Sequence, residues 1–344
     1  MMFSIITTVY NNNPYLFKYL ECVNNLNFKN AELIILNDGS TDNVMEIIKE
    51  NLTFKNVVYV ENQKNIGIFL SQKKALESSK GDYILFLDSD DIFINDVLKD
   101  FEILLKNKDI DVLLYNNRII KSNFLIEECP LDLSRINYNL SLDKVIEEFL
   151  LRTENGSLSN KVFKSNIIKN HTLFDIEFPV RYAPDNLISF LVFMGANNVA
   201  HIDKCYYFAH SRIGSTNRTL SCSRFEEYKF IYNYYDAYLS KYASNNLKRY
   251  NASRYISELL YDYVIVLTAK MTFNDFKVYN RIAREEISSN LEKMDDEYIL
   301  SAPKRVILFS LMKLTPLGTY IFSYVISKVY KMKYTFKRIF GIEE

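Results

Sequence analysis

Strand-like and helix-like segments alternate four times within the first hundred residues, and this alternation is the strongest constraint on the fold. Short apolar runs typical of buried strands occupy residues 2–9, 32–36, 57–60 and 83–87. Segments with apolar residues at three- and four-residue steps separate them. This pattern predicts an α/β fold, a mostly parallel sheet with helices on both faces. Ligands of such sheets bind where the carboxyl ends of the strands meet.

The fourth predicted strand ends in Asp88-Ser89-Asp90-Asp91. Three carboxylates within four residues repel one another unless a cation or several hydrogen bonds absorb the charge. Oxygen ligands of this kind suit Mg²⁺ or Mn²⁺, which are most useful beside a phosphate. The alternative is that Asp90 or Asp91 only caps the next helix. Asp38, which ends the second strand, is expected at the same edge of the sheet.

Composition narrows the class of protein. The 344 residues include 42 basic and 42 acidic side chains, so no overall field attracts nucleic acid, and we expect no such partner. The four cysteines show neither zinc spacing nor a disulfide framework and are typical of a reducing compartment. No signal peptide and no apolar run of about 20 residues is evident. We therefore expect a cytoplasmic protein.

Four motifs occur in a fixed order and at a consistent spacing: Ser4–Asn11, Asn37–Asp42, Asn65–Gly67 and Leu87–Asp91. They resemble those of family 2 glycosyltransferases of the GT-A fold, over about residues 2–100 and more weakly to about 218. That resemblance implies an inverting, metal-dependent transferase that moves a sugar from a nucleotide sugar, expected to be UDP-linked, to a hydroxyl.

The resemblance also assigns roles to individual residues. Asp38 would accept a hydrogen bond from the uracil imide, Asp88 would contact the ribose, and Asp90 would ligate Mn²⁺ or Mg²⁺ between the two phosphates. The alternative for Asp38 is a local turn that fixes the start of the next helix. The residues implied in nucleotide binding are Thr8, Val9, Tyr10, Asp38, Asn65, Gln72, Asp88 and Ser89.

One position departs from the family pattern. The family often has an arginine where this chain has Gln72, and that arginine would help to bind the base or the phosphates. Lys73 or Lys74 could substitute, but a lysine is a point charge and lacks the planar fork of an arginine. The contacts to the donor are therefore expected to differ from the family's.

The resemblance places the catalytic base at Asp185, where the family usually has Glu-Asp. Here Pro184 precedes Asp185, and the alternative is an aspartate that only stabilises the first turn of a helix. The loop after the last strand of the domain would bring further groups to the diphosphate or the metal, although an isolated histidine is often structural. The residues of that loop are His210, Arg212 and Ser215.

Three domains are predicted. Residues 1–220 form the catalytic domain, in which 121–140 are expected as an irregular loop near the acceptor. Residues 221–300 form a helical appendage, with helices near 224–242, 247–271 and 274–291, and 301–344 are basic and amphipathic.

Residues 304–340 carry apolar side chains at helical spacing and lysines or arginines elsewhere, with no acid among them. This pattern favours peripheral binding to an anionic bilayer, on the inner face of a bacterial cytoplasmic membrane. The alternative is a helix that packs on the body with a solvated basic face. Together with the resemblance, it suggests as acceptor a surface glycan: capsule, lipooligosaccharide or a lipid-linked oligosaccharide.

Two other classes of protein remain open. A non-catalytic protein that binds sugar nucleotides would explain both departures, at Gln72 and before Asp185. A sugar nucleotidyltransferase would share the fold and the carboxylates. It should carry a glycine-rich basic loop after the first strand, and Tyr10–Pro14 is no such loop.

Overall fold

The computed structural model describes residues 1–13, 16–26, 29–120, 130–152, 156–169, 171–210, 222–241, 245–265, 273–294, 305, 308–309, 311 and 313–321. The chain divides into two compact units. The first comprises Met1–Phe149 and Thr153–Ile213, and the second comprises Leu150–Arg152 and Gly214–Glu344. The finer division predicted at residues 220 and 300 stays a prediction.

The first unit is built on a sheet of nine strands within its described residues, in the order β3-β2-β1-β4-β8-β6-β9-β5, with β7 paired to β9. Strands β1 to β4 are parallel and match the four that the sequence predicts. The mostly parallel α/β class is thereby confirmed. The four strands are β1 (Phe3–Val9), β2 (Ala31–Asn37), β3 (Val57–Glu61) and β4 (Tyr83–Phe86).

The other half of the sheet mixes directions. Strand β8 runs antiparallel to both β4 and β6, while β6 and β9 are parallel. The prediction of an irregular loop over 121–140 is wrong at its end, where Ile136–Leu140 forms β7 on the edge of β9; residues 121–129 lie outside the described part. The further strands are β5 (Ile92–Phe93), β6 (Val112–Ile120), β8 (Lys161–Lys164) and β9 (Val199–His210).

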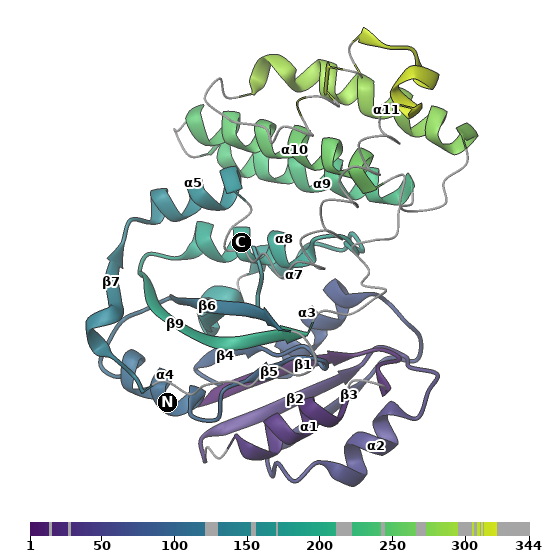
Figure 1. Ribbon diagram of the computed structural model, residues 1–344. Coiled ribbons are helices and arrows are strands. Elements are labelled where there is room, and N and C mark those ends of the chain that lie inside the picture. Colours follow the sequence, from purple (N-terminus) through teal and green to yellow (C-terminus); the bar gives the residue numbers. More distant parts are fainter. Residues whose placement is uncertain are drawn as a thin grey trace, which may run out of the picture. The chain divides into compact units, whose positions relative to one another are not determined.

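Helices cover both faces of this sheet (Figure 1). Alternate strand residues, such as Ile5 and Leu33, join a core with the apolar sides of α1 and α4, while Ile6 and Ile34 are buried on the other face. The apolar side of α1, formed by Leu16, Tyr19, Leu20 and Val23, is buried. The helices are α1 (Leu16–Asn25), α2 (Val44–Asn51), α3 (Ile68–Ser78), α4 (Val97–Leu105), α5 (Leu142–Arg152), α6 (Ser165–Ile168), α7 (His171–Phe174) and α8 (Pro184–Gly195).

Neither Ser40 nor Thr41, which lie in the turn before α2, caps this helix. The N-cap is Asn43, and no side chain makes a capping hydrogen bond there. Ser40 and Thr41 bind the turn after β1 instead: Ser40 Oγ accepts from Asn11 N–H (3.1 Å) and Thr41 N–H donates to Asn11 Oδ1 (2.8 Å).

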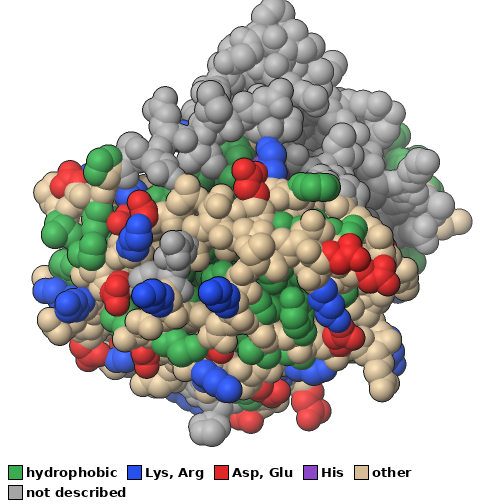
Figure 2. All heavy atoms as spheres, turned by 90° about the horizontal axis from the view of Figure 1, so that it is seen from below, with side chains coloured by type: hydrophobic (Ala, Val, Ile, Leu, Met, Phe, Trp, Pro, Cys, Tyr) green, Lys and Arg blue, Asp and Glu red, His purple; other side chains and the backbone are tan. Residues whose placement is uncertain are grey.

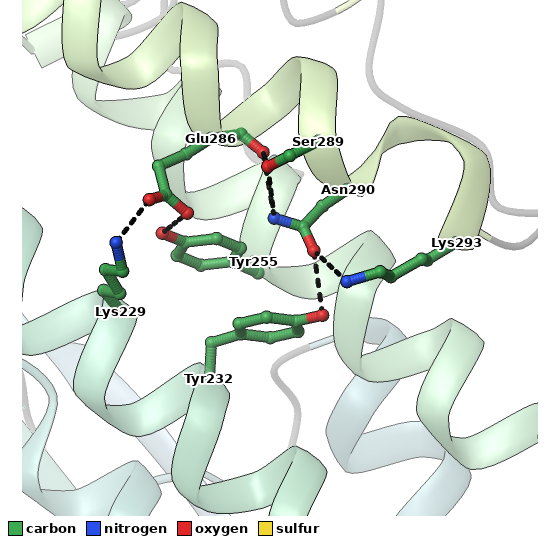
Figure 3. Close-up of polar contacts among 7 residues, drawn as sticks. All are labelled: Lys229, Tyr232, Tyr255, Glu286, Ser289, Asn290 and Lys293. Carbon is green, nitrogen blue, oxygen red and sulfur yellow. Dashed lines mark hydrogen bonds and ion pairs between the residues drawn. The ribbon is translucent and has the colours of Figure 1, made fainter.

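The second unit contains three long helices where the sequence predicts them, α9 (Cys222–Leu239), α10 (Asn245–Ile265) and α11 (Phe273–Asn290), followed by the short η4 (Leu291–Lys293). Polar side chains link them (Figure 3). Glu286 on α11 accepts from Lys229 on α9 (2.6 Å) and from Tyr255 on α10 (3.2 Å), and Tyr255 stacks on Tyr232 at 4.5 Å between ring centroids. Full pairing of these groups is typical of a structural role.

The basic segment 304–340 lies largely outside the described residues, so its membrane helix stays a prediction. Among the helices of the described part of the chain, none combines the length and hydropathy needed to span a bilayer. On the face shown in Figure 2, basic and acidic side chains are interspersed with apolar ones.

Candidate functional site

The three aspartates of the acidic turn after β4 differ in burial and in hydrogen bonding. Asp88 is exposed, whereas Asp90 and Asp91 are buried. The Asp91 carboxylate accepts from the Tyr207 hydroxyl (2.7 Å) and from the His210 backbone N–H (2.8 Å), both on β9. Neither buried aspartate caps α4, whose N-cap is Asp96, so that alternative is wrong. The hydrogen bonds of Asp91 therefore fix the turn, which leaves Asp88 exposed and Asp90 buried.

The end of β1 is tied to this turn. Thr7 Oγ1 donates to the Leu87 carbonyl (2.8 Å), and the Asn12 amide donates to Ser89 Oγ (2.7 Å). Thr8 is partly buried, Val9 is buried and Tyr10 is 49% exposed at the same strand end. Tyr10 therefore offers an aromatic surface beside the carboxyl ends of the strands, where a nucleotide base could stack.

Asp38 holds the loop between β3 and α3. Its Oδ1 accepts from the Asn62 amide (2.9 Å) and the Ile66 N–H (2.9 Å), and its Oδ2 accepts from the Gly67 N–H (3.0 Å). The Asp38 carboxylate therefore does not form the local turn at the start of α2 that was the alternative. A carboxylate can accept about four hydrogen bonds, so these three leave capacity for an imide donor. The uracil contact stays a prediction.

Gly39 allows the turn after β2 to approach this loop. It has φ +68°, and a Cβ placed there would lie 2.5 Å from the Lys64 carbonyl carbon and 2.7 Å from Asn65 N. Only glycine fits such a position without moving backbone. Asn65 is exposed beside it, at the edge predicted to meet the nucleotide.

The two lysines predicted as substitutes for the missing arginine are engaged elsewhere. Lys73 Nζ donates to the carbonyls of Phe174 (3.0 Å) and Ile176 (2.6 Å). Lys74 Nζ donates to the Glu61 carbonyl (2.9 Å) and to the side chain of Asn62 (2.7 Å). Both lysines join loops of the scaffold.

Gln72 is buried on α3 and its side chain is hydrogen-bonded to Asp185. Its Oε1 has no hydrogen-bond partner among the described residues. The structure thus brings together two residues that the sequence assigns to different tasks. The predicted contact of Gln72 with the nucleotide stays a prediction.

Asp185 lies in the first turn of α8, after Pro184 at the start of the helix. The residue keeps some exposed surface, but its carboxyl group is surrounded by protein atoms, and this burial raises its pKa. Lys161, the Leu158 N–H and the Gln72 side chain lower the pKa in part. A carboxylate with a raised pKa is closer to the value a general base needs near neutral pH.

Ala183, the N-cap of α8, has φ +54°. A non-glycine residue in the left-handed region is uncommon, and such strain is often found at functional sites. Its conformation sets the direction from which α8 presents Asp185.

Lys161 is a residue of the site that the sequence did not reveal. It begins β8 and is 0% exposed, and burial lowers its pKa to about 7. Its Nζ donates to the Ser157 carbonyl and to Asn160 Oδ1 (2.7 Å). A lysine between polar and apolar residues gives no sign of burial, so only the fold could show it.

His210 ends β9, and its Nε2 lies 3.4 Å from Lys18 Nζ. Its Nδ1 is buried and has no partner among the described residues. Arg212 and Ser215 lie outside the described part of the chain, so their predicted contacts stay predictions.

The described residues contain no group of three or more His, Cys, Asp or Glu side chains arranged to hold a metal ion. The donor set still fits Mg²⁺ or Mn²⁺, which commonly bind one or two carboxylates together with substrate phosphates and water. Asp90 and the exposed Asp88 supply such oxygens beside a well-fixed Asp91.

Comparisons with known proteins agree with this geometry. The family model "Glycosyl transferase family 2" matches residues 4–141. Poly(ribitol-phosphate) beta-N-acetylglucosaminyltransferase TarS of Staphylococcus aureus (strain MW2) is 28% identical over 228 residues, which cover 62% of this chain and 36% of TarS. The putative glycosyltransferase EpsH of Bacillus subtilis (strain 168) is 23% identical over 280 residues, covering 81% of this chain and 80% of EpsH. The match thus spans about a third of TarS and most of EpsH.

Solved structures show the same fold. The crystal structure of S. aureus TarS 1–349 in complex with UDP-GlcNAc superposes with a TM-score of 0.66 at 19% identity, covering 97% of this chain and 92% of that one. The GT-A fold that the sequence motifs predict is confirmed. Residues 4–141 of the chain therefore match a glycosyl transferase family 2 domain, on a fold that the chain shares with TarS.

Proposed function

We propose that the protein is an inverting glycosyltransferase that moves a sugar from a UDP-sugar to a hydroxyl of a glycan. The observation that carries this proposal is Asp185, whose buried carboxyl group is held by the Leu158 N–H and Gln72 at the start of α8. A carboxylate that is fixed and has a raised pKa suits the removal of a proton from an acceptor hydroxyl.

In the proposed reaction, Asp185 takes the proton of the acceptor hydroxyl. The hydroxyl oxygen attacks the anomeric carbon of the donor sugar from the face opposite the diphosphate. The bond from that carbon to the phosphate oxygen breaks, and its electron pair leaves with UDP. The anomeric configuration is therefore inverted, and one proton is passed from the acceptor to the enzyme.

The proposed donor site is the edge where β1, β2 and β4 end. Support comes from the UDP-GlcNAc in the TarS complex, which has the same fold. Asp38 and the exposed Tyr10 would meet the base, and Asp88 the ribose. Because Gln72 contacts Asp185, other groups would bind the diphosphate. The proposed groups are His210, Arg212 and Ser215, which lie close together in sequence.

We also propose a divalent cation, Mn²⁺ or Mg²⁺, at Asp90. When bound, the cation supplies positive charge that stabilises the departing diphosphate. Asp91 and Tyr207 keep the turn in place through their hydrogen bond. Asp88 lies on the same turn, two residues before Asp90, and would therefore lie near the bound cation.

The proposed acceptor is a bacterial surface glycan, such as capsule, lipooligosaccharide or a lipid-linked oligosaccharide, reached from the membrane surface. Support comes from the basic amphipathic pattern of 304–340. Three large apolar side chains in the described part of this segment, Phe309, Leu317 and Ile321, are exposed. Deleting 303–344 should abolish binding to vesicles that contain anionic lipid. Unchanged cosedimentation of the shortened protein would contradict the membrane proposal.

A donor screen tests the proposed function. Thermal shift with a panel of UDP-sugars, with and without Mn²⁺, should raise the melting temperature for one sugar, and that sugar should be hydrolysed slowly in the absence of acceptor. Stabilisation by a UDP-sugar without hydrolysis or transfer would instead support a non-catalytic binding protein. No stabilisation by any UDP-linked compound would contradict the donor class.

A further inference from the structure

A single peptide group, between Ser157 and Leu158, contacts both charged residues of the site. Its carbonyl oxygen accepts a hydrogen bond from Lys161 Nζ, and its N–H donates to the Asp185 carboxylate. The oxygen and the hydrogen of a trans peptide point in opposite directions. The ammonium and the carboxylate therefore lie at opposite ends of one dipole that is oriented favourably for both.

Lys161 is unusual as a structural residue. Fully buried lysines are rare unless an anion compensates them, because removing an ammonium from water is costly. The hydrogen-bond partners of Nζ, the Ser157 carbonyl and Asn160 Oδ1, are neutral, and Nζ lies 5.8 Å from the centroid of the Phe193 ring. Asp185 is the acidic group whose charge acts on Lys161.

The surroundings of Asp185 lead to the same pair. Its hydrogen-bond donors, the Leu158 N–H, the Gln72 amide and its own N–H, are neutral, and Lys161 is the charged group that acts on it. The two residues are thus each other's electrostatic partners within the described part of the chain.

We propose that Lys161 is a positioning residue, which keeps Asp185 in its ionised form through the Ser157–Leu158 peptide group. This inference rests on the proposed role of Asp185 as the base. Lys161 does not contact the substrate; it acts through the carboxylate. Polarisation of the peptide group between them strengthens both hydrogen bonds.

The effect of Lys161 on the ionisation of Asp185 should be strongest below neutral pH. Burial lowers the pKa of Lys161 to about 7, so the ammonium is present mainly below that pH. This is also where Asp185, with its raised pKa, is closest to taking up a proton. Lys161 therefore extends to lower pH the range in which the base is available.

The test measures the protonation of Asp185 itself. Protein with ¹³C-labelled aspartate carboxyls is titrated by NMR, and the Asp185 signal is assigned by its loss in Asp185→Asn. Lys161→Met should raise the midpoint of this signal by about one pH unit, which corresponds to about a tenfold change in the protonation equilibrium. Lys161→Gln, which keeps a donor for Ser157 but removes the charge, should do the same.

Lys164→Met is the matched control. Lys164 lies on the same strand, but its ammonium pairs with the exposed Asp109 and the buried Asp111 and not with Asp185, so the midpoint should not move. A midpoint unchanged in both Lys161 variants would overturn the proposal, and so would an equal shift in the control. This readout needs no activity, so a failure of the proposed transferase function would be seen separately.

The rate provides a second readout. Both Lys161 variants should lose more kcat relative to wild type the further the pH falls below neutrality, by at most about tenfold, whereas near pH 8.5 they should match it. A uniform loss at every pH would indicate a merely structural lysine and would contradict the proposal.

Discussion

Lys161 and Asp185 bind the two ends of the same peptide group, the ammonium at the Ser157 carbonyl and the carboxylate at the Leu158 N–H. One residue begins β8 and the other lies in the first turn of α8. The loop before β8 thus does more than close the sheet, because it orients the proposed base and its positive partner together.

The stability of the protein should reflect the buried lysine. The folded pKa of Lys161, about 7, lies below its ordinary value of 10.5, so the folded state is penalised while the lysine is charged. That penalty is present below about pH 7 and is lost as the pH rises toward 10.5, where the unfolded chain also loses its proton. From pH 7 to 9, the free energy of unfolding of wild type should rise by about 2 kcal/mol relative to Lys161→Met.

Urea unfolding at the two pH values measures this difference, with Lys164→Met as the control for a partly exposed lysine. A constant difference between wild type and Lys161→Met would contradict the lowered pKa.

Gln72 should serve the base and not the nucleotide. Gln72→Leu removes the side-chain hydrogen bond to Asp185, and loss of a bond to a charged group should lower kcat by about tenfold or more. The Kd for UDP, measured by calorimetry, should stay within about twofold because no contact to the donor is lost. In the Asp185→Asn background the same change should have no further effect. A large rise in Kd would instead support the nucleotide contact that the sequence predicts.

Tyr207 should matter to the acidic turn. Its hydroxyl donates to Asp91 (2.7 Å) and accepts from the Asp88 N–H (3.3 Å), so Tyr207→Phe removes both bonds. We expect a loss of about 1–3 kcal/mol in stability together with weaker UDP binding in Mn²⁺.

Tyr206→Phe is the matched control for this change. Its hydroxyl binds Asp100 (2.9 Å) in the core, so it should lower stability without affecting UDP binding. Equal effects of both variants on UDP affinity would contradict a specific role for Tyr207.

The proposed metal site makes a separate prediction. Asp90→Asn removes the negative charge of a buried carboxylate at the proposed site. The affinity for UDP should fall to the level that wild type shows with EDTA, and Mn²⁺ should no longer improve it. Asp132→Asn, at an exposed turn held by Ser134, is a control that should leave the Mn²⁺ effect intact. Persistence of that effect in Asp90→Asn would place the cation elsewhere.

The sequence predicts much of the fold, because its periodicity reports local burial. The parallel strands β1 to β4 and the buried side of α1 follow from apolar spacing alone. Strand β7 was missed, since its polar and apolar residues lie at a half-exposed edge and resemble a loop.

The site could be predicted only in part. The motifs predict roles for Asp38, Asp90 and Asp185, and these roles stay predictions; the partners of a side chain depend on contacts between distant segments. Gln72 and Asp185 are 113 positions apart, and neither sequence context indicates their hydrogen bond. Lys161 gave no signal, because burial of a lysine is a property of the folded sheet and not of its neighbours in the chain.

Asp185 is the proposed base of the glycosyl transfer. With the donor and acceptor identified, the most direct measurement is the single-turnover rate of Asp185→Asn, beside its Kd for UDP and the exposed control Asp175→Asn. Loss of general-base catalysis should lower the rate by about 10²–10⁴-fold in Asp185→Asn while UDP binding is unchanged. The control should behave as wild type. A rate for Asp185→Asn within about threefold of wild type would contradict the assignment, because general-base catalysis contributes far more than that.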